Sequence, residues 1–101
     1  MVYVYCVGRI VVVGGNHDEY KHCKHLLEHV EAIGGCVEYK GFVLTHIPIH
    51  ESQIDRFRGN IHGHLHTFTI DHPKYFNASC EQIEYKPKTI EELMEIALRL
   101  K

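Results

Sequence analysis

The chain has 101 residues, 45% of them hydrophobic and 24% charged, with a formal net charge of −2 and a pI near 6.5. This length and composition are typical of one globular domain, so we expect residues 1–101 to form a single domain. The slight negative charge gives no strong basic field for nucleic acid or for an anionic membrane surface. Because we find neither a signal-peptide pattern nor an apolar run long enough to cross a bilayer, we expect a cytoplasmic protein.

Histidine is the residue whose frequency is unusual, because the chain has ten histidines but only three aspartates. Such an excess favours metal or phosphate chemistry. The four cysteines are widely separated and form no C-x-x-C pair, which argues against a zinc ribbon or a thioredoxin-like redox site. We expect four reduced and mostly buried thiols: Cys6, Cys23, Cys36 and Cys80.

The amino-terminal third favours two strands and a helix. Val2–Val7 and Ile10–Val13 are rich in β-branched and aromatic residues and are predicted strands. Ile10–Val13 is apolar throughout, as in a parallel strand that is buried on both faces. From Glu19–Ile33 the apolar residues recur at helical spacing, so we expect an amphipathic helix with Asp18 as its N-cap.

The middle of the chain favours a hairpin and a third short strand. Cys36–Tyr39 and Phe42–His46 flank Lys40-Gly41, the pattern of a tight hairpin turn. Glu51–Arg58 is polar and predicts a short helix or a loop. Asn60–His64 predicts a short strand that ends near Gly63.

The carboxy-terminal third favours a second hairpin and a helix. Thr67–Ile70 and Tyr75–Ala78 are predicted to pair around the turn Asp71-His72-Pro73. Thr89 opens the final helix with a capping box, Thr-Ile-Glu-Glu. Because strands alternate with helices and then cluster, the sequence predicts an α/β fold.

Three histidine-containing segments each follow or end a predicted strand. They are G-N-H-D at Gly15–Asp18, T-H-I-P-I-H at Thr45–His50 and G-H-L-H at Gly63–His66. Ligands in α/β sheets bind outside the carboxyl ends of strands, so the three segments can meet at one edge. Each segment alone is a weak signal, but several imidazoles and an amide oxygen together suit a borderline divalent ion.

In this order the three segments resemble the last three signature blocks of the calcineurin-like metallophosphoesterase superfamily. The small bacterial and phage members are the most similar, because an N-x-S segment, here Asn77–Ser79, follows their G-H-x-H block. The resemblance covers roughly Ile10–Ser79. It implies a partial calcineurin-like α/β/β/α sandwich with mixed sheets and two main helices. It also implies hydrolysis of a phosphomonoester or phosphodiester substrate by metal-activated water.

The resemblance further implies a set of site residues. Asn16, His46 and His64 would bind the second metal ion of the family's site, and His66 would belong to the first. The metal would be divalent, with manganese the first expectation and zinc, iron or nickel the alternatives.

His17 and Asp18 are the catalytic residues that the resemblance implies. His17 would contact the phosphate and help to protonate the leaving oxygen, while Asp18 would orient the imidazole of His17.

The chain departs from the family pattern because the D-x-H and G-D blocks have no counterpart before Asn16. The first aspartate is Asp18, so the bridging carboxylate is missing. A second copy, another chain, or a substitute such as Asp71 or His62 would have to supply the remaining metal ligands; otherwise the site holds one metal or is inactive. Two further hypotheses follow: a non-catalytic metal-binding regulatory module, and one half of a split phosphoesterase completed by an amino-terminal chain.

The missing blocks also leave Ile10–Val13 without the strands that lie beside it in the family. An exposed apolar strand invites pairing, so we expect Val2–Val7 to cover it or a second subunit to pair with it in a homodimer.

The remaining histidines have simpler interpretations. His22, His25 and His29 fall on the polar face of the predicted first helix, where solvent exposure is the expected role. His25 and His29 are also spaced i,i+4, as in a surface metal pair. We expect His62 to pack in the core or to support a ligand, with a role as a metal ligand the alternative. We expect His50 to be mainly structural, with contact to substrate the alternative.

Overall fold

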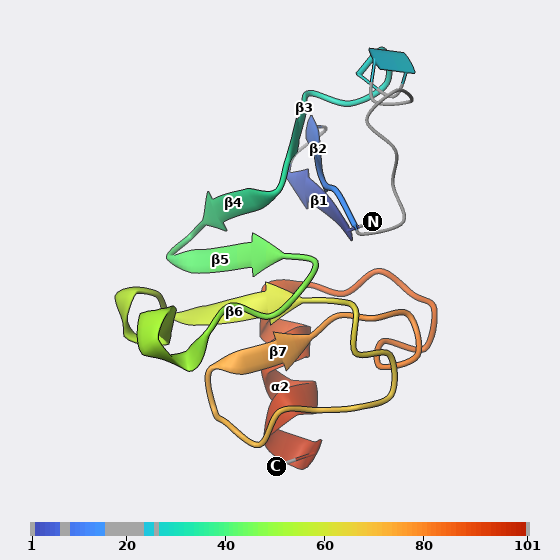
Figure 1. Ribbon diagram of the computed structural model, residues 1–101. Coiled ribbons are helices and arrows are strands. Elements are labelled where there is room, and N and C mark those ends of the chain that lie inside the picture. The colour runs from blue at the N-terminus through green and yellow to red at the C-terminus, as the bar shows by residue number, and fades with distance from the viewer. Residues whose placement is uncertain (1, 7–8, 16–23, 26, 101) are drawn as a thin grey trace.

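The computed structural model describes residues 2–6, 9–15, 24–25 and 27–100 (Figure 1). Its strands form two sheets, and two helical elements, η1 and α2, lie in the carboxy-terminal half. In chain order the elements are β1 (Val2–Cys6), β2 (Arg9–Val13), β3 (Ala32–Gly34), β4 (Cys36–Tyr39), β5 (Phe42–Thr45), the 3-10 helix η1 (Glu51–Arg56), β6 (Gly59–His62), β7 (Tyr75–Asn77) and α2 (Ile90–Leu100). The predicted α/β class is therefore confirmed.

The smaller sheet has the order β1-β2-β3. β1 pairs antiparallel with β2 over Val2–Cys6, and β3 pairs parallel with β2. β2 thus has a neighbouring strand on each side, and the expectation that the first strand covers it is confirmed for Val2–Cys6, while Val7 lies outside the described residues. Both backbone edges of β2 are paired within the chain, by β1 and β3. A homodimer built at this sheet stays a prediction.

The larger sheet has the order β4-β5-β6-β7. The predicted hairpin of β4 and β5 is confirmed, and both turn residues, Lys40 and Gly41, have positive φ (51° and 85°), as tight hairpin turns require. β5, β6 and β7 run parallel to one another. Their carboxyl ends therefore lie at one edge of the sheet, which we call the carboxyl edge.

One hydrophobic core joins the two sheets and the final helix. α2 contacts β7 and lies behind β6 and β7 in the view of Figure 1. The Phe42 and Phe76 rings pack edge to face with centroids 5.9 Å apart. The buried core cluster comprises Val13, Phe42, Leu44, Ile61, Phe76 and Leu93. Because Val13 ends β2, the carboxyl end of that strand is anchored in the core of the larger sheet.

The capping box of α2 is confirmed. The backbone N–H of Glu92 donates to Thr89 Oγ1, and the N–H of Thr89 donates to Glu92 Oε1, each at 3.1 Å. These bonds satisfy two of the amide groups that the first turn of a helix leaves unpaired. They also lower the pKa of the Glu92 carboxyl, chiefly through the bond from the Thr89 backbone.

The predicted helix over Glu19–Ile33 is wrong at its carboxyl end. Residues 24 and 25 are helical, but residues 27–29 form a turn and Ala32–Gly34 forms β3. Ala32 and Ile33 pair with Val11 and Val12 of β2. A short apolar segment fits either helix or strand, and the open backbone edge of β2 decides in favour of the strand. Residues 19–23 and 26 lie outside the described residues.

The predicted second hairpin is also wrong. Tyr75–Asn77 is a strand, but it pairs parallel with β6, whereas residues 67–70 form turn and irregular structure. A backbone carbonyl in this stretch, that of Phe68, accepts a 2.8 Å hydrogen bond from Asn77 Nδ2. A side-chain contact to β7 therefore replaces the strand ladder that we expected.

Two further expectations have outcomes in the described part of the chain. Cys36 and Cys80 are free thiols, as expected, but both are exposed rather than buried, because Cys36 starts the edge strand β4 and Cys80 lies in a surface turn. Among the described residues, no helix has the length and apolar character needed to cross a membrane.

Candidate metal centre

The carboxyl edge of the larger sheet carries two of the three histidine-containing segments. His46 directly follows β5, and the G-H-L-H segment directly follows β6. The third segment follows β2, but Asn16, His17 and Asp18 lie outside the described residues. What the structure does describe there is Val13, which is buried in the same core as Leu44 of β5 and Ile61 of β6.

His46 and His64 are in direct contact. The distance from His64 Nδ1 to His46 Nε2 is 3.3 Å, and the two rings meet edge to face with centroids 5.1 Å apart. The backbone supports this approach, because the N–H of Gly63 donates to the carbonyl of His46 at 2.9 Å. Parallel pairing of β5 and β6 therefore brings together two imidazoles that are 18 residues apart in the sequence.

The G-H-L-H loop has an unusual backbone. His64 and His66 both have positive φ, 67° and 53°. Residues other than glycine adopt this left-handed conformation rarely, and holding one there costs roughly 1–3 kcal/mol. The N–H of Leu65 donates to the Gly63 carbonyl at 2.7 Å, which tightens the loop around these two positions. Such local strain is commonly found at functional sites.

His66 contacts Glu81 rather than the His46–His64 pair. Its Nδ1 lies 2.9 Å from Glu81 Oε1, with 73% and 32% of the two side chains exposed. The hydrogen bond from His66 is the main cause that lowers the pKa of the Glu81 carboxyl. A carboxylate on Nδ1 orients an imidazole and leaves Nε2 as the nitrogen for a ligand. The resemblance likewise implies that His66 belongs to a different ion from the one that His46 and His64 would bind.

Asn60 holds the loop that carries His46. It is fully buried in β6. Its Oδ1 accepts from the Ile49 N–H at 2.9 Å, and its Nδ2 donates to Val43 O and Thr45 Oγ1, both at 3.0 Å. This amide therefore fixes both ends of the segment that begins at Thr45.

Tyr75 adds a second anchor to the same loop. Its hydroxyl donates to the Ile49 carbonyl at 2.7 Å. Burial, with a smaller effect from the Glu51 carboxylate, raises the pKa of Tyr75, which keeps this hydroxyl protonated and able to donate.

The N-x-S segment supports the G-H-L-H loop. Asn77 Nδ2 donates to the carbonyls of His66 and Phe68 at 3.1 and 2.8 Å, while its Oδ1 accepts from the Ser79 N–H at 2.9 Å. Asn77 thus links the carboxyl end of β7 to the loop that presents His64 and His66.

Other residues considered from the sequence have different positions. His62 is fully buried and, together with Leu93, lines a cavity of about 20 Å³, which suits a core role. His50 caps η1, because its Nδ1 accepts from the Ser52 N–H at 3.1 Å. Asp71 lies exposed in a bend, and no described contact brings it to the His46–His64 pair.

Sequence reasoning missed Glu81 and Asn60. Glu81 lies in an irregular segment 15 residues after His66, so no periodicity connects the two. Asn60 gave a usable signal, since a polar residue beside Ile61 in a short buried strand needs hydrogen-bond partners.

Comparisons with models of protein families, with curated proteins and with solved structures give no match for this chain. The resemblance to metallophosphoesterases therefore stays a prediction from the sequence segments.

Proposed function

We propose that this chain binds a divalent metal ion at His46 and His64 and hydrolyses phosphoesters with it. The observation that carries the proposal is the 3.3 Å distance between His64 Nδ1 and His46 Nε2. Two nitrogens bound to zinc at about 2.0–2.1 Å and at a tetrahedral angle lie about 3.3–3.4 Å apart. The two imidazoles therefore fit one ion without a large rearrangement.

The surroundings of this pair suit a ligand site. A bound divalent ion would supply Lewis acidity and activate water for attack on phosphorus. His64 reaches the pair from a strained loop, and Asn60 holds the loop that carries His46. His66, oriented by Glu81, adds a third imidazole at the same edge, where it can donate a hydrogen bond to a phosphate oxygen. The expected roles of Asn16 as a ligand, of His17 as an acid and of Asp18 as its partner remain part of this proposal.

The test is metal binding and phosphoester hydrolysis by the chelator-treated chain. Manganese or zinc content is measured after equilibrium dialysis, and hydrolysis of a chromogenic phosphodiester and its monoester counterpart is measured with added manganese. We expect His64→Ala and Asn16→Ala to lower both binding and turnover. His50→Asn is the control, because asparagine preserves the η1 cap. A wild-type chain without turnover, or equal turnover in His64→Ala, would reject the enzyme.

A second candidate function is a non-catalytic metal-binding module. It is favoured by the sequence before Asp18, which contains no aspartate and so lacks a bridging carboxylate. Tight binding of one ion by the wild-type chain without hydrolysis would select this function. Hydrolysis that begins only when an amino-terminal chain with the D-x-H and G-D blocks is added would instead select a split enzyme.

A further inference from the structure

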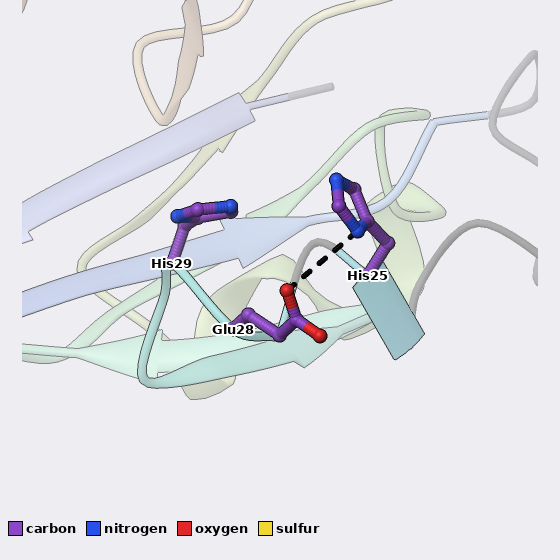
Figure 2. Close-up of side chains that lie close together, drawn as sticks. All are labelled: His25, Glu28 and His29. Carbon is purple, nitrogen blue, oxygen red and sulfur yellow. Dashed lines mark ion pairs between the residues drawn. The ribbon is translucent and has the colours of Figure 1, made fainter.

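A second group of metal-ligating side chains lies in the connection between β2 and β3. His25, Glu28 and His29 are all exposed, and one nitrogen or oxygen from each lies within 4.8 Å of those of the other two. Figure 2 shows the Glu28 carboxylate between the two imidazoles, with its ion pair to His25 as a dashed line. We call these three residues the turn cluster.

The backbone of the turn explains why the three side chains meet. The N–H of Glu28 donates to the carbonyl of His25 at 3.2 Å, which closes the turn. Residues three and four positions apart then project to the same side. The N–H of Glu31 donates to the Ile10 carbonyl at 2.7 Å and ties the end of the turn to the start of β2.

The separations within the turn cluster are close to those of a metal site. His25 Nδ1 and Glu28 Oε2 are 3.6 Å apart, and the imidazole centroids of His25 and His29 are 5.7 Å apart. Ligands around a tetrahedral zinc ion lie about 3.3–3.4 Å from one another. All separations lie within 4.8 Å, so none has to shorten by more than roughly 1.5 Å. Side chains that are 81% and 66% exposed, those of His25 and Glu28, can rotate into this arrangement with little obstruction.

We propose that His25, Glu28 and His29 bind one zinc ion, with water completing its coordination. Two imidazole nitrogens and one carboxylate oxygen are a donor set that zinc takes with three protein ligands. The order of these residues, His-x-x-Glu-His, also occurs in a class of zinc peptidases. Here all three side chains are exposed and no substrate cleft is described beside them, so metal binding, and not peptide hydrolysis, is what the geometry supports.

The turn cluster is separate from the candidate metal centre. It precedes the amino end of β3, next to the amino end of β2, whereas His46 and His64 follow the carboxyl ends of β5 and β6. In Figure 1 the turn lies at the far end of the smaller sheet from the larger sheet. The proposal therefore does not depend on phosphoesterase activity.

The experiment is a zinc titration of the full chain after chelator treatment, carried out in a His46→Ala, His64→Ala background. Calorimetry measures stoichiometry and affinity, and imidazole nitrogen NMR identifies the histidines that respond. We expect one equivalent of zinc to bind and the signals of His25 and His29 to shift. Adding His25→Gln and His29→Gln should abolish this binding. Adding Glu28→Gln should weaken it at least about tenfold, the loss that even indirect partners of a metal cause.

The matched control is His72→Gln. His72 also lies beside a glutamate, with its Nε2 3.8 Å from Glu51 Oε1, but this ion pair contains one imidazole and not two. This variant should leave zinc affinity unchanged. Circular dichroism of each variant verifies that the fold is retained. The proposal is overturned if the background protein binds no zinc, if binding survives His25→Gln with His29→Gln, or if the NMR shifts fall on other histidines. Two chains bound per ion would also overturn it, because the site would then form between molecules.

Discussion

Asn60→Ala tests the idea that one buried amide fixes the loop carrying His46. The substitution removes the three shorter hydrogen bonds of the Asn60 side chain, with Ile49 N, Val43 O and Thr45 Oγ1, and a longer one to Ile61 O at 3.4 Å. Leaving a buried donor or acceptor unsatisfied costs about 1–3 kcal/mol. If each of the three closer partners costs the lower limit of about 1 kcal/mol, the free energy of unfolding should fall by about 3 kcal/mol. A chain of this size has a total stability of roughly 5–15 kcal/mol, so the variant should be folded but clearly weakened.

Urea unfolding followed by circular dichroism measures this loss. With a slope of about 1–3 kcal/mol per molar urea, the midpoint should fall by roughly 1–3 M while the slope stays constant. Asn77→Ala is the matched control, because Asn77 is less buried and its bonds to loop carbonyls are exposed to water. A midpoint for Asn60→Ala that is no lower than that of Asn77→Ala would refute the reasoning.

Three further predictions concern the cap, the carboxylate beside His66 and a tight strand contact. Thr89→Ala should lower stability by about 1 kcal/mol in urea unfolding. Bonds from Thr89, the backbone bond first, lower the pKa of Glu92 below its ordinary 4.5, and Thr89→Ala removes only the smaller, side-chain contribution. That contribution to stability is present above pH 4.5 and is lost as pH falls through the lowered pKa, so a stability difference from wild type that does not shrink in acid would contradict the reasoning. Because the bond from His66 lowers the pKa of Glu81, Glu81→Gln should remove a contribution to stability that is present above pH 4.5 and lost in acid. It should also change the tautomer of His66 that NMR detects, and an unchanged tautomer would exclude an orienting role for Glu81. Gly59→Ala should destabilise by about 1–3 kcal/mol, because its methyl group would overlap Phe76, and wild-type stability would count against this packing.

The parts of the fold that were predictable are those specified by local sequence. Lys40-Gly41 between two apolar segments specifies a hairpin turn, and Thr89 with a glutamate three positions later specifies a helix start. Both signals are contained within a few residues, and both elements are present in the structure.

The parts that were not predictable depend on distant partners. Ala32 and Ile33 fit a helical stripe as well as a strand, and only the open edge of β2 selects the strand. Thr67–Ile70 has the composition of a strand, but Asn77 binds a carbonyl within this stretch and the backbone does not form a ladder. Parallel pairing between β6 and β7 requires a crossover, which hairpin patterns do not reveal.

The candidate centre was predictable in outline, since strand ends indicate where polar side chains gather. Because β5 and β6 are parallel, the histidines that follow them, His46 and His64, are expected at the same edge of the sheet, and their contact agrees with this expectation. It does not reveal Glu81, because a residue in irregular structure has no register with a strand. Nor does it reveal that His64 and His66 adopt left-handed backbone conformations, which arise from the hydrogen bonding of the whole loop.

The contact between His46 and His64 has a consequence for how this small protein assembles. The two imidazoles meet only after β5 and β6, which η1 separates in the sequence, have paired. A cation bound by both imidazoles would therefore stabilise the pairing of these two strands. At a free concentration one hundred times its dissociation constant, such a ligand adds about 2.7 kcal/mol to the stability of the native state. The melting temperature of the chain would then report directly on how much ion is available.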